Sequence, residues 1–130
     1  MKSYFDDFLE VANASVPLLI KEVSWDNIAL YMGGDNWHFN TLGDWVVVND
    51  VIMIKGCHDS DAELYLKEMI GRSIIRIERS KEEPSYDPIL VIDNGLRVRI
   101  FSTSVIDPWT FKFGVSSFFV ASPSDDDWNG

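Results

Sequence analysis

The chain has 130 residues with 21 acidic and 11 basic side chains, a formal net charge of −10 at pH 7. One domain is expected at this length, and the single cysteine excludes an intrachain disulfide. The acidic excess argues against nucleic-acid and anionic-membrane partners, because phosphate binding depends on clustered lysines and arginines. No apolar run approaches the roughly 18 to 20 residues of a membrane-spanning helix. Asp6, Asp7 and Glu10 stand where a signal peptide would be apolar, so a cytoplasmic protein is expected.

Residues 3–12 predict a short amphipathic helix. Ser3 and Asp6 have the spacing of a capping box, which marks a helix start. Asn13 and Pro17 predict its end, because a proline ring removes a backbone donor and disfavours a helical residue before it. The apolar residues at helical spacing are Phe5, Phe8, Leu9 and Ala12.

After Pro17 the pattern changes to period two, which is typical of β-strands. We expect a strand at residues 20–23 and then a hairpin over residues 28–39, in which Gly33-Gly34 supplies the positive φ of a tight turn. A second hairpin is expected over residues 45–54, turning at Asn49-Asp50. This half of the chain is therefore predicted to be a β-meander.

A second helix is predicted over residues 60–70. Ser60 and Glu63 repeat the capping-box spacing, and Gly71 follows where a glycine commonly ends a helix. Its expected apolar stripe consists of Ala62, Leu66, Met69 and Ile70.

Further strands are predicted in the second half. Residues 74–78 form one, and residues 89–101 form a hairpin because Asn94-Gly95 between alternating apolar residues is a strong turn signal. The polar, proline-bearing residues 79–88 are expected to be a loop. The last expected strands are residues 109–113 and 115–120.

The two halves resemble each other. Ile20-Lys-Glu-Val precedes the first hairpin as Ile74-Ile-Arg-Ile precedes the second, and each hairpin leads to a strand that begins with a tryptophan, Trp45 or Trp109. A repeated unit, made of a strand, a hairpin and a further strand, would explain this likeness, with a helix between the two copies. The alternative is a chance likeness of two meanders.

The predicted fold class is α+β, a mostly antiparallel sheet of about eight strands built from two similar meander halves, with two short helices. Residues 1–121 are expected to form this domain. Residues 122–130 contain three consecutive aspartates and are expected to be a flexible acidic tail.

No residue pattern declares a catalytic chemistry, so an enzyme is not expected. His38 falls in a predicted strand between Trp37 and Phe39, which suggests a solvent-side histidine rather than a general base. Cys57-His58-Asp59 offers three metal ligands, but consecutive residues do not easily converge on one ion and no second ligand pair follows. We expect no metal and no cofactor, although two carboxylates brought together only by the fold would leave no pattern in the sequence.

Charge is unevenly distributed along the chain. Residues 1–63 hold 11 acids and three bases, whereas residues 64–112 hold seven acids and eight bases. Many early acids fall at predicted turns or helix starts, where Asp is also favoured for its local hydrogen bonds. If the turns gather at one end of a sheet, these carboxylates form a negative rim.

Two tryptophans next to predicted turns, Trp25 and Trp37, also lie close to acids in the sequence. Exposed there, they would be typical of a protein-binding surface; burial is the alternative. The candidate partner-binding residues are Trp25, Asp26, Asp35, Trp37, Asp44, Asp59, Asp61 and Glu63.

Three segments carry a family resemblance: Met69-Ile-Gly-Arg-Ser-Ile-Ile-Arg-Ile, the hairpin from Ile89 to Ser102, and Pro108-Trp109. Together they cover about a third of the chain. This pattern resembles small immunity proteins of bacterial polymorphic toxin systems, including contact-dependent growth inhibition. The resemblance implies a cytoplasmic, non-enzymatic inhibitor that binds one cognate toxin, and it carries over no contact residue.

Toxins of such systems are often nucleases, whose substrate groove must be cationic to hold phosphates. We therefore expect an immunity protein whose acidic surface occludes such a groove. The alternatives are a small-molecule-binding module or small enzyme with an aromatic-lined pocket, and a structural subunit that self-associates through an open sheet edge. The oligomeric state is not predicted.

Overall fold

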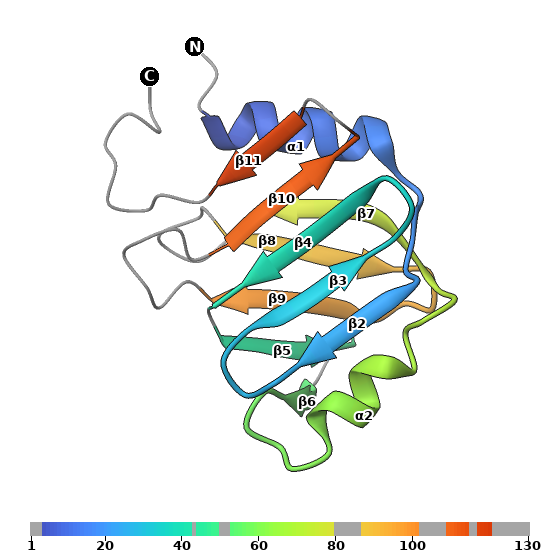
Figure 1. The fold of residues 1–130 in the computed structure, drawn as a ribbon, viewed down its shortest axis with the longest axis vertical. Coiled ribbons are helices and arrows are strands. Elements are labelled where there is room, and N and C mark those ends of the chain that lie inside the picture. The colour runs from blue at the N-terminus through green and yellow to red at the C-terminus, as the bar shows by residue number, and fades with distance from the viewer. Residues whose placement is uncertain are drawn as a thin grey trace.

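The computed structural model describes residues 4–42, 44–49, 53–79, 87–101, 109–114 and 117–120. These residues form two helices and eleven strands (Figure 1). The elements are α1 (Tyr4–Ser15), β1 (Leu18–Leu19), β2 (Glu22–Trp25), β3 (Leu30–Gly33), β4 (Trp37–Thr41), β5 (Asp44–Val48), β6 (Met53–Gly56), α2 (Ala62–Lys67), β7 (Ser73–Arg79), β8 (Pro88–Ile92), β9 (Arg97–Phe101), β10 (Trp109–Phe113) and β11 (Ser117–Val120).

The strands form two antiparallel sheets that lie face to face. The six-stranded sheet has the order β1-β7-β8-β9-β5-β6, and the five-stranded sheet has the order β11-β10-β4-β3-β2. The α+β class and the antiparallel pairing are as predicted. The expectation of about eight strands in one sheet is wrong, because an alternating pattern marks which side of a strand is buried but does not say which sheet the strand joins.

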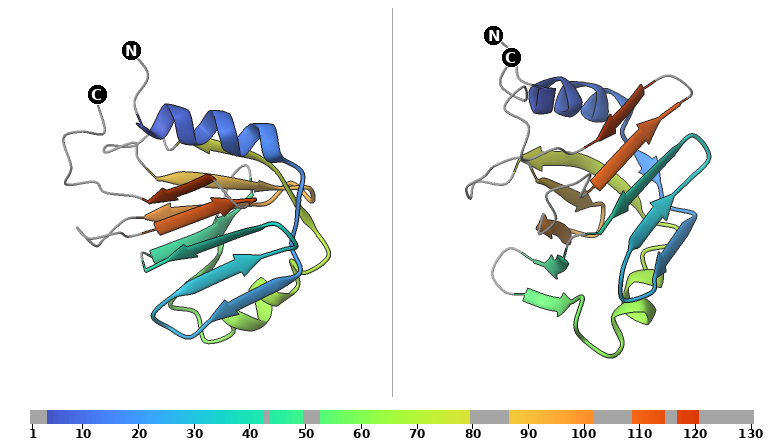
Figure 2. Two further views of the ribbon diagram at one scale, coloured as in Figure 1. Left: turned by 45° about the horizontal axis from the view of Figure 1, so that its top comes forward. Right: turned by 60° about the vertical axis from the view of Figure 1, so that its left-hand side comes forward.

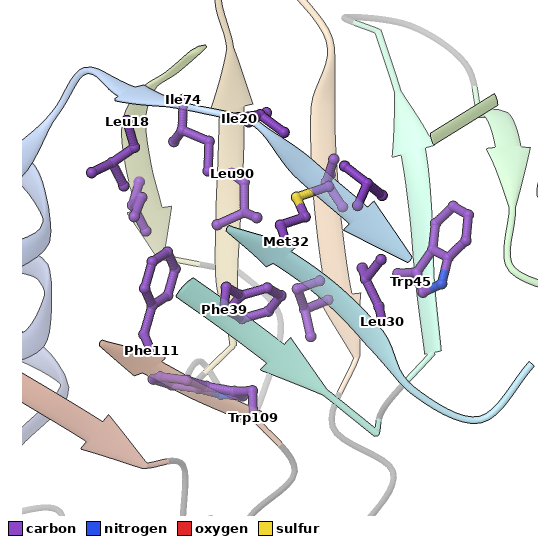
Figure 3. Packing of buried hydrophobic residues seen from close by; sticks show 14 of the residues in the cluster. Leu18, Ile20, Leu30, Met32, Phe39, Trp45, Ile74, Leu90, Trp109 and Phe111 are labelled. Carbon is purple, nitrogen blue, oxygen red and sulfur yellow. The ribbon is translucent and has the colours of Figure 1, made fainter. Parts of the chain in front are cut away.

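The inner faces of the two sheets are filled by large side chains (Figure 3). Trp45 of the six-stranded sheet and Trp109 of the five-stranded sheet are both almost completely buried. The rings of Phe39 and Phe111 lie 5.0 Å apart, and α1 adds Phe8, whose ring lies 4.8 Å from that of Trp109. These aromatic residues form the core together with aliphatic side chains such as Leu30, Ile74 and Leu90.

The strand order is similar in the two halves of the chain. The meander β2-β3-β4 belongs to one sheet and the meander β7-β8-β9 to the other. The strand that follows each meander crosses over, so β5 pairs with β9 and β10 pairs with β4. The next strand then adds at the outside, β6 on β5 and β11 on β10. Each half thus supplies a meander to one sheet and two strands, β5 and β6 or β10 and β11, to the other; β1 of the first half adds to β7 at the edge of the six-stranded sheet and has no counterpart among the described strands of the second half.

The helices occupy equivalent places in the two halves. α1 packs against β7, which is in the other half, and α2 packs against β2 and β6. Figure 2 shows α1 at one side of the pair of sheets and α2 at the opposite side. Each helix therefore covers one of the two flanks where the sheets would otherwise leave the core open.

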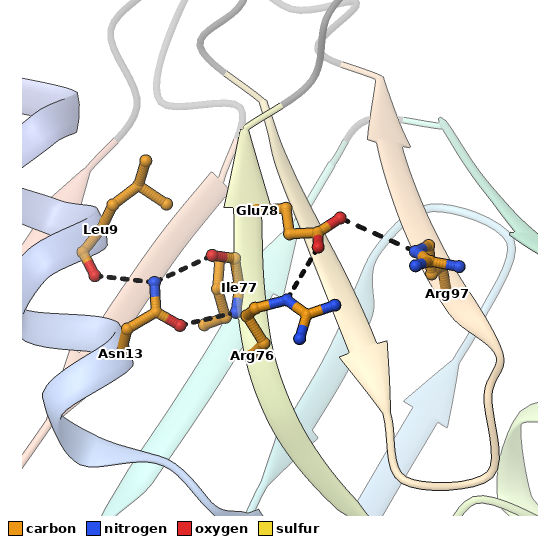
Figure 4. A network of polar contacts seen from close by, with 6 residues as sticks. All are labelled: Leu9, Asn13, Arg76, Ile77, Glu78 and Arg97. Carbon is orange, nitrogen blue, oxygen red and sulfur yellow. Dashed lines mark hydrogen bonds and ion pairs between the residues drawn. The ribbon is translucent and has the colours of Figure 1, made fainter.

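Asn13 attaches α1 to β7 (Figure 4). Its side-chain amide donates to the carbonyl oxygens of Ile77, at 2.9 Å, and Leu9, at 3.0 Å, and its Oδ1 accepts the Ile77 N–H at 2.9 Å. β1 pairs with β7 only at Ser73 and Ile74, so Asn13 satisfies the backbone of β7 beyond that pairing. Asn13 was expected to end the helix, but α1 continues to Ser15.

The glycines of the β3–β4 turn have a different role from the predicted one. Neither Gly33 nor Gly34 has a positive φ. A Cβ on Gly34 would lie 2.3 Å from the carbonyl oxygen of Leu19 and 2.3 Å from Nε1 of Trp37. Glycine is therefore needed there for close approach of the chain. At the β8–β9 turn the prediction is confirmed, since Gly95 has φ of 89°.

The second helix is shorter than predicted. α2 covers Ala62–Lys67, its N-cap is Asp61, and no side-chain hydrogen bond caps it, so the expected Ser60 capping box is wrong. Asp61 instead forms an ion pair with Lys55. Three members of the predicted stripe, Ala62, Leu66 and Met69, are buried, and Ile70 is exposed. Most of the predicted loop at 79–88 lies outside the described residues. The predicted tail at 122–130 lies wholly outside them.

Candidate functional site

Trp25 and Trp37 do not form an exposed contact surface. They are 8% and 6% exposed, and both belong to the core. The Trp25 ring lies 5.5 Å from that of Trp45, nearly perpendicular to it, and the Trp37 indole N–H donates to the Leu19 carbonyl at 3.0 Å. Each ring points to the inner side of its strand, so the expectation of exposed tryptophans is corrected.

The candidate carboxylates do not form one patch. Asp26 lies in the β2–β3 turn and Asp35 in the β3–β4 turn, so the two are at opposite ends of β3. Three of the acids have a lysine partner: Asp35 pairs with Lys21 at 2.8 Å, Asp61 with Lys55 at 2.9 Å, and Glu63 with Lys67 at 3.9 Å. The predicted rim is therefore smaller than expected and partly neutralised.

Asp26, Asp44 and Asp59 remain as exposed acids that form no ion pair with a lysine or arginine of the described chain. Asp26 directly follows Trp25, and Asp44 directly precedes Trp45. The rings of these two tryptophans are in contact. Two acids from different sheets are thereby held near the same end of the molecule.

The carboxylate of Asp26 organises its own turn. It accepts the backbone N–H groups of Ile28 at 2.9 Å and Ala29 at 2.8 Å. These two bonds hold the pKa of Asp26 below its ordinary value of 3.8, and the bond from Ala29 has the larger effect. The side chain is therefore ionised at neutral pH and fixed in orientation.

A cleft of about 380 Å³ opens beside the start of β5 and the turn after β6. Asp44 and Asp59 line it, together with His58 and the largely buried Cys57. The remaining lining residues are Trp45, Val46, Gly56 and Phe101. Two of the three aspartates that have no lysine or arginine partner in the described chain therefore share this cleft.

Within the cleft three different donor atoms come together. One ligand atom each from Asp44, Cys57 and His58 lies within 4.8 Å of the others, and His58 Nε2 is 3.9 Å from Asp44 Oδ2. Burial, together with the neighbouring Asp44 carboxylate, raises the pKa of the Cys57 thiol. The thiol is therefore protonated at neutral pH and unsuited to act as a free nucleophile.

The sequence pointed to two members of this group, Cys57 and His58, but not to Asp44. Consecutive residues do not easily converge on one ion and no second ligand pair follows in the sequence, which is why Cys57 and His58 were not expected to bind a metal. Both residues lie in the turn after β6, where the Asp59 N–H donates to the Gly56 carbonyl at 3.1 Å and the Asp59 carboxylate accepts the Gly56 N–H at 2.8 Å. The third member, Asp44, comes from β5, and only strand pairing brings it close.

His38 lies away from this cleft, on the outer face of the five-stranded sheet, as predicted for a solvent-side strand residue. Its Nδ1 is 3.3 Å from the Asn40 amide nitrogen, and its ring lies 6.2 Å from that of Tyr31. Burial and the charge of Glu22 raise the pKa of Tyr31, whose hydroxyl donates to Glu22 at 3.4 Å. This polar group lies on an open sheet face.

A second cleft, of about 410 Å³, lies beside the β3–β4 turn, at the end of β3 far from Asp26. It is lined by Pro17, Trp37 and Phe113, among other residues. Its one carboxylate, Asp35, is already paired with Lys21. We therefore regard the cleft at Asp44, Cys57, His58 and Asp59 as the candidate functional site.

Neither helix in the described part of the chain has the length and apolar character needed to span a bilayer. Comparison of the sequence and the fold with family models, curated proteins and solved structures gave no match.

Proposed function

We propose that this chain is an immunity protein that binds one bacterial toxin and blocks its cationic active site with an acidic surface. The toxin is a nuclease, because a nuclease must present lysines and arginines to hold its substrate phosphates. The contact surface is the end of the molecule that carries Asp26, Asp44 and Asp59. The tryptophans beneath it support this surface from the core and do not touch the toxin.

The observation that carries the proposal is the exposure of these three aspartates without a lysine or arginine partner in the described chain. An ion pair already formed within the protein contributes little to attracting a partner, whereas an unpaired carboxylate on a rigid turn contributes fully. Asp26 and Asp59 are both held by backbone N–H groups, so they are preorganised.

The packing of the aromatic residues favours inhibition over small-molecule binding. A binding module would use its aromatic face to line a chamber. Here Phe39 packs against Phe111, and Phe111 and Trp109 both pack against Phe8 of α1, so these rings fill the space between the sheets. His38, the histidine expected in such a chamber, lies on an outer face, hydrogen-bonded to Asn40.

The distribution of basic residues also supports the proposal. The arginines of the described strands all lie in β7 and β9 of the six-stranded sheet. On its outer face Glu78 accepts from Arg76 at 2.8 Å and is 3.7 Å from Arg97 (Figure 4). The arginines of the described strands thus lie in a different sheet from β2, the strand that Asp26 follows, and this uneven distribution of charge would orient the molecule toward a cationic groove.

A protection assay tests the assignment. Toxin domains encoded immediately upstream of this chain are expressed in cells with and without it, and we expect survival only when it is present. Equal killing in both cases contradicts the proposal. The double variant Asp26→Asn with Asp59→Asn should protect less well, and the control Asp35→Asn with Glu63→Gln removes the same charge from acids that have lysine partners.

Association kinetics with the purified toxin test the electrostatic part. Raising the salt from about 0.01 M to 1 M shortens the Debye length from about 30 Å to about 3 Å. We expect the association rate constant to fall at least about tenfold over this range. The Asp26→Asn, Asp59→Asn variant should show a weaker salt dependence than its control. An association rate unaffected by salt would refute electrostatic occlusion.

A further inference from the structure

Three different side-chain groups converge at the candidate cleft: a carboxylate, a thiol and an imidazole. The proposed function uses only the charge of the carboxylate. Donor atoms of Asp44, Cys57 and His58 all lie within 4.8 Å of one another. Oxygen, sulfur and nitrogen donors in one group are the ligand types that zinc accepts in proteins. We propose that Asp44, Cys57 and His58 bind a zinc ion.

The distances are close to those of a metal site. Zinc bonds of 2.0 to 2.3 Å in a tetrahedron place neighbouring ligand atoms about 3.3 to 3.6 Å apart. His58 Nε2 and Asp44 Oδ2 are 3.9 Å apart, so a shift of about half an ångström brings them to that separation. The His58 side chain is 88% exposed and that of Asp44 is 52% exposed, so both can rotate without disturbing the core.

The backbone around the third ligand is held in place. The Cys57 N–H donates to the carbonyl of Trp45 at 3.1 Å, which ties the turn after β6 to β5 one residue beyond Asp44. Two hydrogen bonds between Gly56 and Asp59 close the turn itself. The site therefore combines one fixed, largely buried ligand with two adjustable ones.

The same side chains are poorly arranged for the other chemistry that they suggest. A cysteine nucleophile depends on a cationic neighbour such as a protonated histidine, whereas here the negative carboxylate of Asp44 lies within 4.8 Å of both the Cys57 thiol and the His58 imidazole. A divalent cation is attracted by all three groups together and accounts for their convergence. With three protein ligands the fourth position faces the cleft, where water or a partner's side chain completes the tetrahedron.

Cobalt titration of the full-length, chelator-treated protein tests this inference. Co²⁺ occupies zinc sites and reports a thiolate ligand by a charge-transfer absorption in the near ultraviolet. Cys57 is the single cysteine, so this band can arise only from the proposed site. We expect one equivalent of Co²⁺ to produce the band and Zn²⁺ to abolish it by displacement.

Variants of the exposed ligands decide the outcome, because they leave the core intact. His58→Gln and Asp44→Asn should each weaken Co²⁺ binding at least about tenfold, since loss of an outer-shell partner alone costs 10- to 100-fold. The matched controls are His38→Gln, the other histidine, and Asp35→Asn, and both should bind as the unaltered protein does. Absence of the band, or an affinity unchanged in His58→Gln and Asp44→Asn, overturns the inference.

The metal site and the proposed function can fail separately. Cobalt binding is measured on the purified protein without the toxin, and the protection variants change Asp26 and Asp59, which are not metal ligands in this proposal. Protection of cells by a protein that gives no Co²⁺ band would refute the metal site alone. Metal binding by a protein that gives no protection would refute the proposed function alone.

Discussion

Single side chains in this protein take their roles from the backbone groups that they meet. Asp26 is held by the N–H groups of its own turn, and Gly34 is required because the chain passes close to Leu19 and Trp37. Trp25 and Trp37 face inward although both adjoin turns. Position relative to a turn is visible in a sequence, but the side of the strand that faces the core depends on the partner sheet.

Asp26 gives a prediction about acid stability. Its pKa is lowered in the folded protein, so its contribution to stability is present above the ordinary value of 3.8 and is lost as pH falls through the lower folded value. In Asp26→Asn the free energy of unfolding should therefore depend less on pH between about pH 5 and pH 2. Urea denaturation at several pH values measures this, and a carboxyl titration by NMR with a midpoint above 3.8 would contradict it.

Gly34 gives a prediction about packing. In Gly34→Ala the new Cβ would meet a backbone carbonyl, which cannot move aside as a side-chain end can, and would also displace the Trp37 indole from its bond to Leu19. We expect a loss of about 1 to 3 kcal/mol in the free energy of unfolding, as for other overpacked sites. Chemical denaturation followed by tryptophan fluorescence measures the loss. An alanine variant as stable as the unaltered protein would show that the two segments can separate freely.

Helices and strands depend on contacts across the repeat. α1 belongs to the first half of the chain and packs on β7 of the second half, while α2 packs on β2 of the first. β5 and β10 likewise pair with the meander of the opposite half. Neither half could therefore bury its core faces alone, and the two must fold together.

Asn13 tests the attachment of α1. Asn13→Ala removes both hydrogen bonds to Ile77, and we expect it to reduce the free energy of unfolding by about 1 to 3 kcal/mol. Asn13→Asp is the matched comparison, because it keeps an acceptor for the Ile77 N–H and loses only the donor. Hydrogen exchange should show a faster rate at the Ile77 amide in Asn13→Ala than in Asn13→Asp. Equal protection in all three proteins would mean that the aromatic contacts of α1 suffice.

The net charge of −10 acts on the molecule as a whole. Like charges repel within the compact state, and added salt screens this repulsion. The exposed ion pairs, such as Lys21 with Asp35, are weakened by salt as well, but pairs of this kind contribute little. Screening of the repulsion should therefore outweigh the loss of the pairs.

Thermal unfolding tests this balance. We expect Tm to rise by roughly 2 to 5 °C between about 0.01 M and 0.15 M sodium chloride, a shift that corresponds to about 1 kcal/mol. Differential scanning calorimetry at constant pH measures it. Sodium chloride is preferable to sulfate, which also strengthens apolar burial. A Tm that falls with added salt would show that the ion pairs matter more than the repulsion.

The sequence by itself determined the features that depend on neighbouring residues: the amphipathic α1, the alternating strands, the Asn94-Gly95 turn and the repeated order of elements. Only the tertiary structure decided that β5 and β10 exchange sheets, that Asp35 and Asp61 are paired with lysines, and that Asp44 meets Cys57 and His58. The reason is physical. Backbone periodicity and turn geometry act over a few residues, whereas strand pairing and charge pairing join residues that are distant in the chain and leave no local pattern.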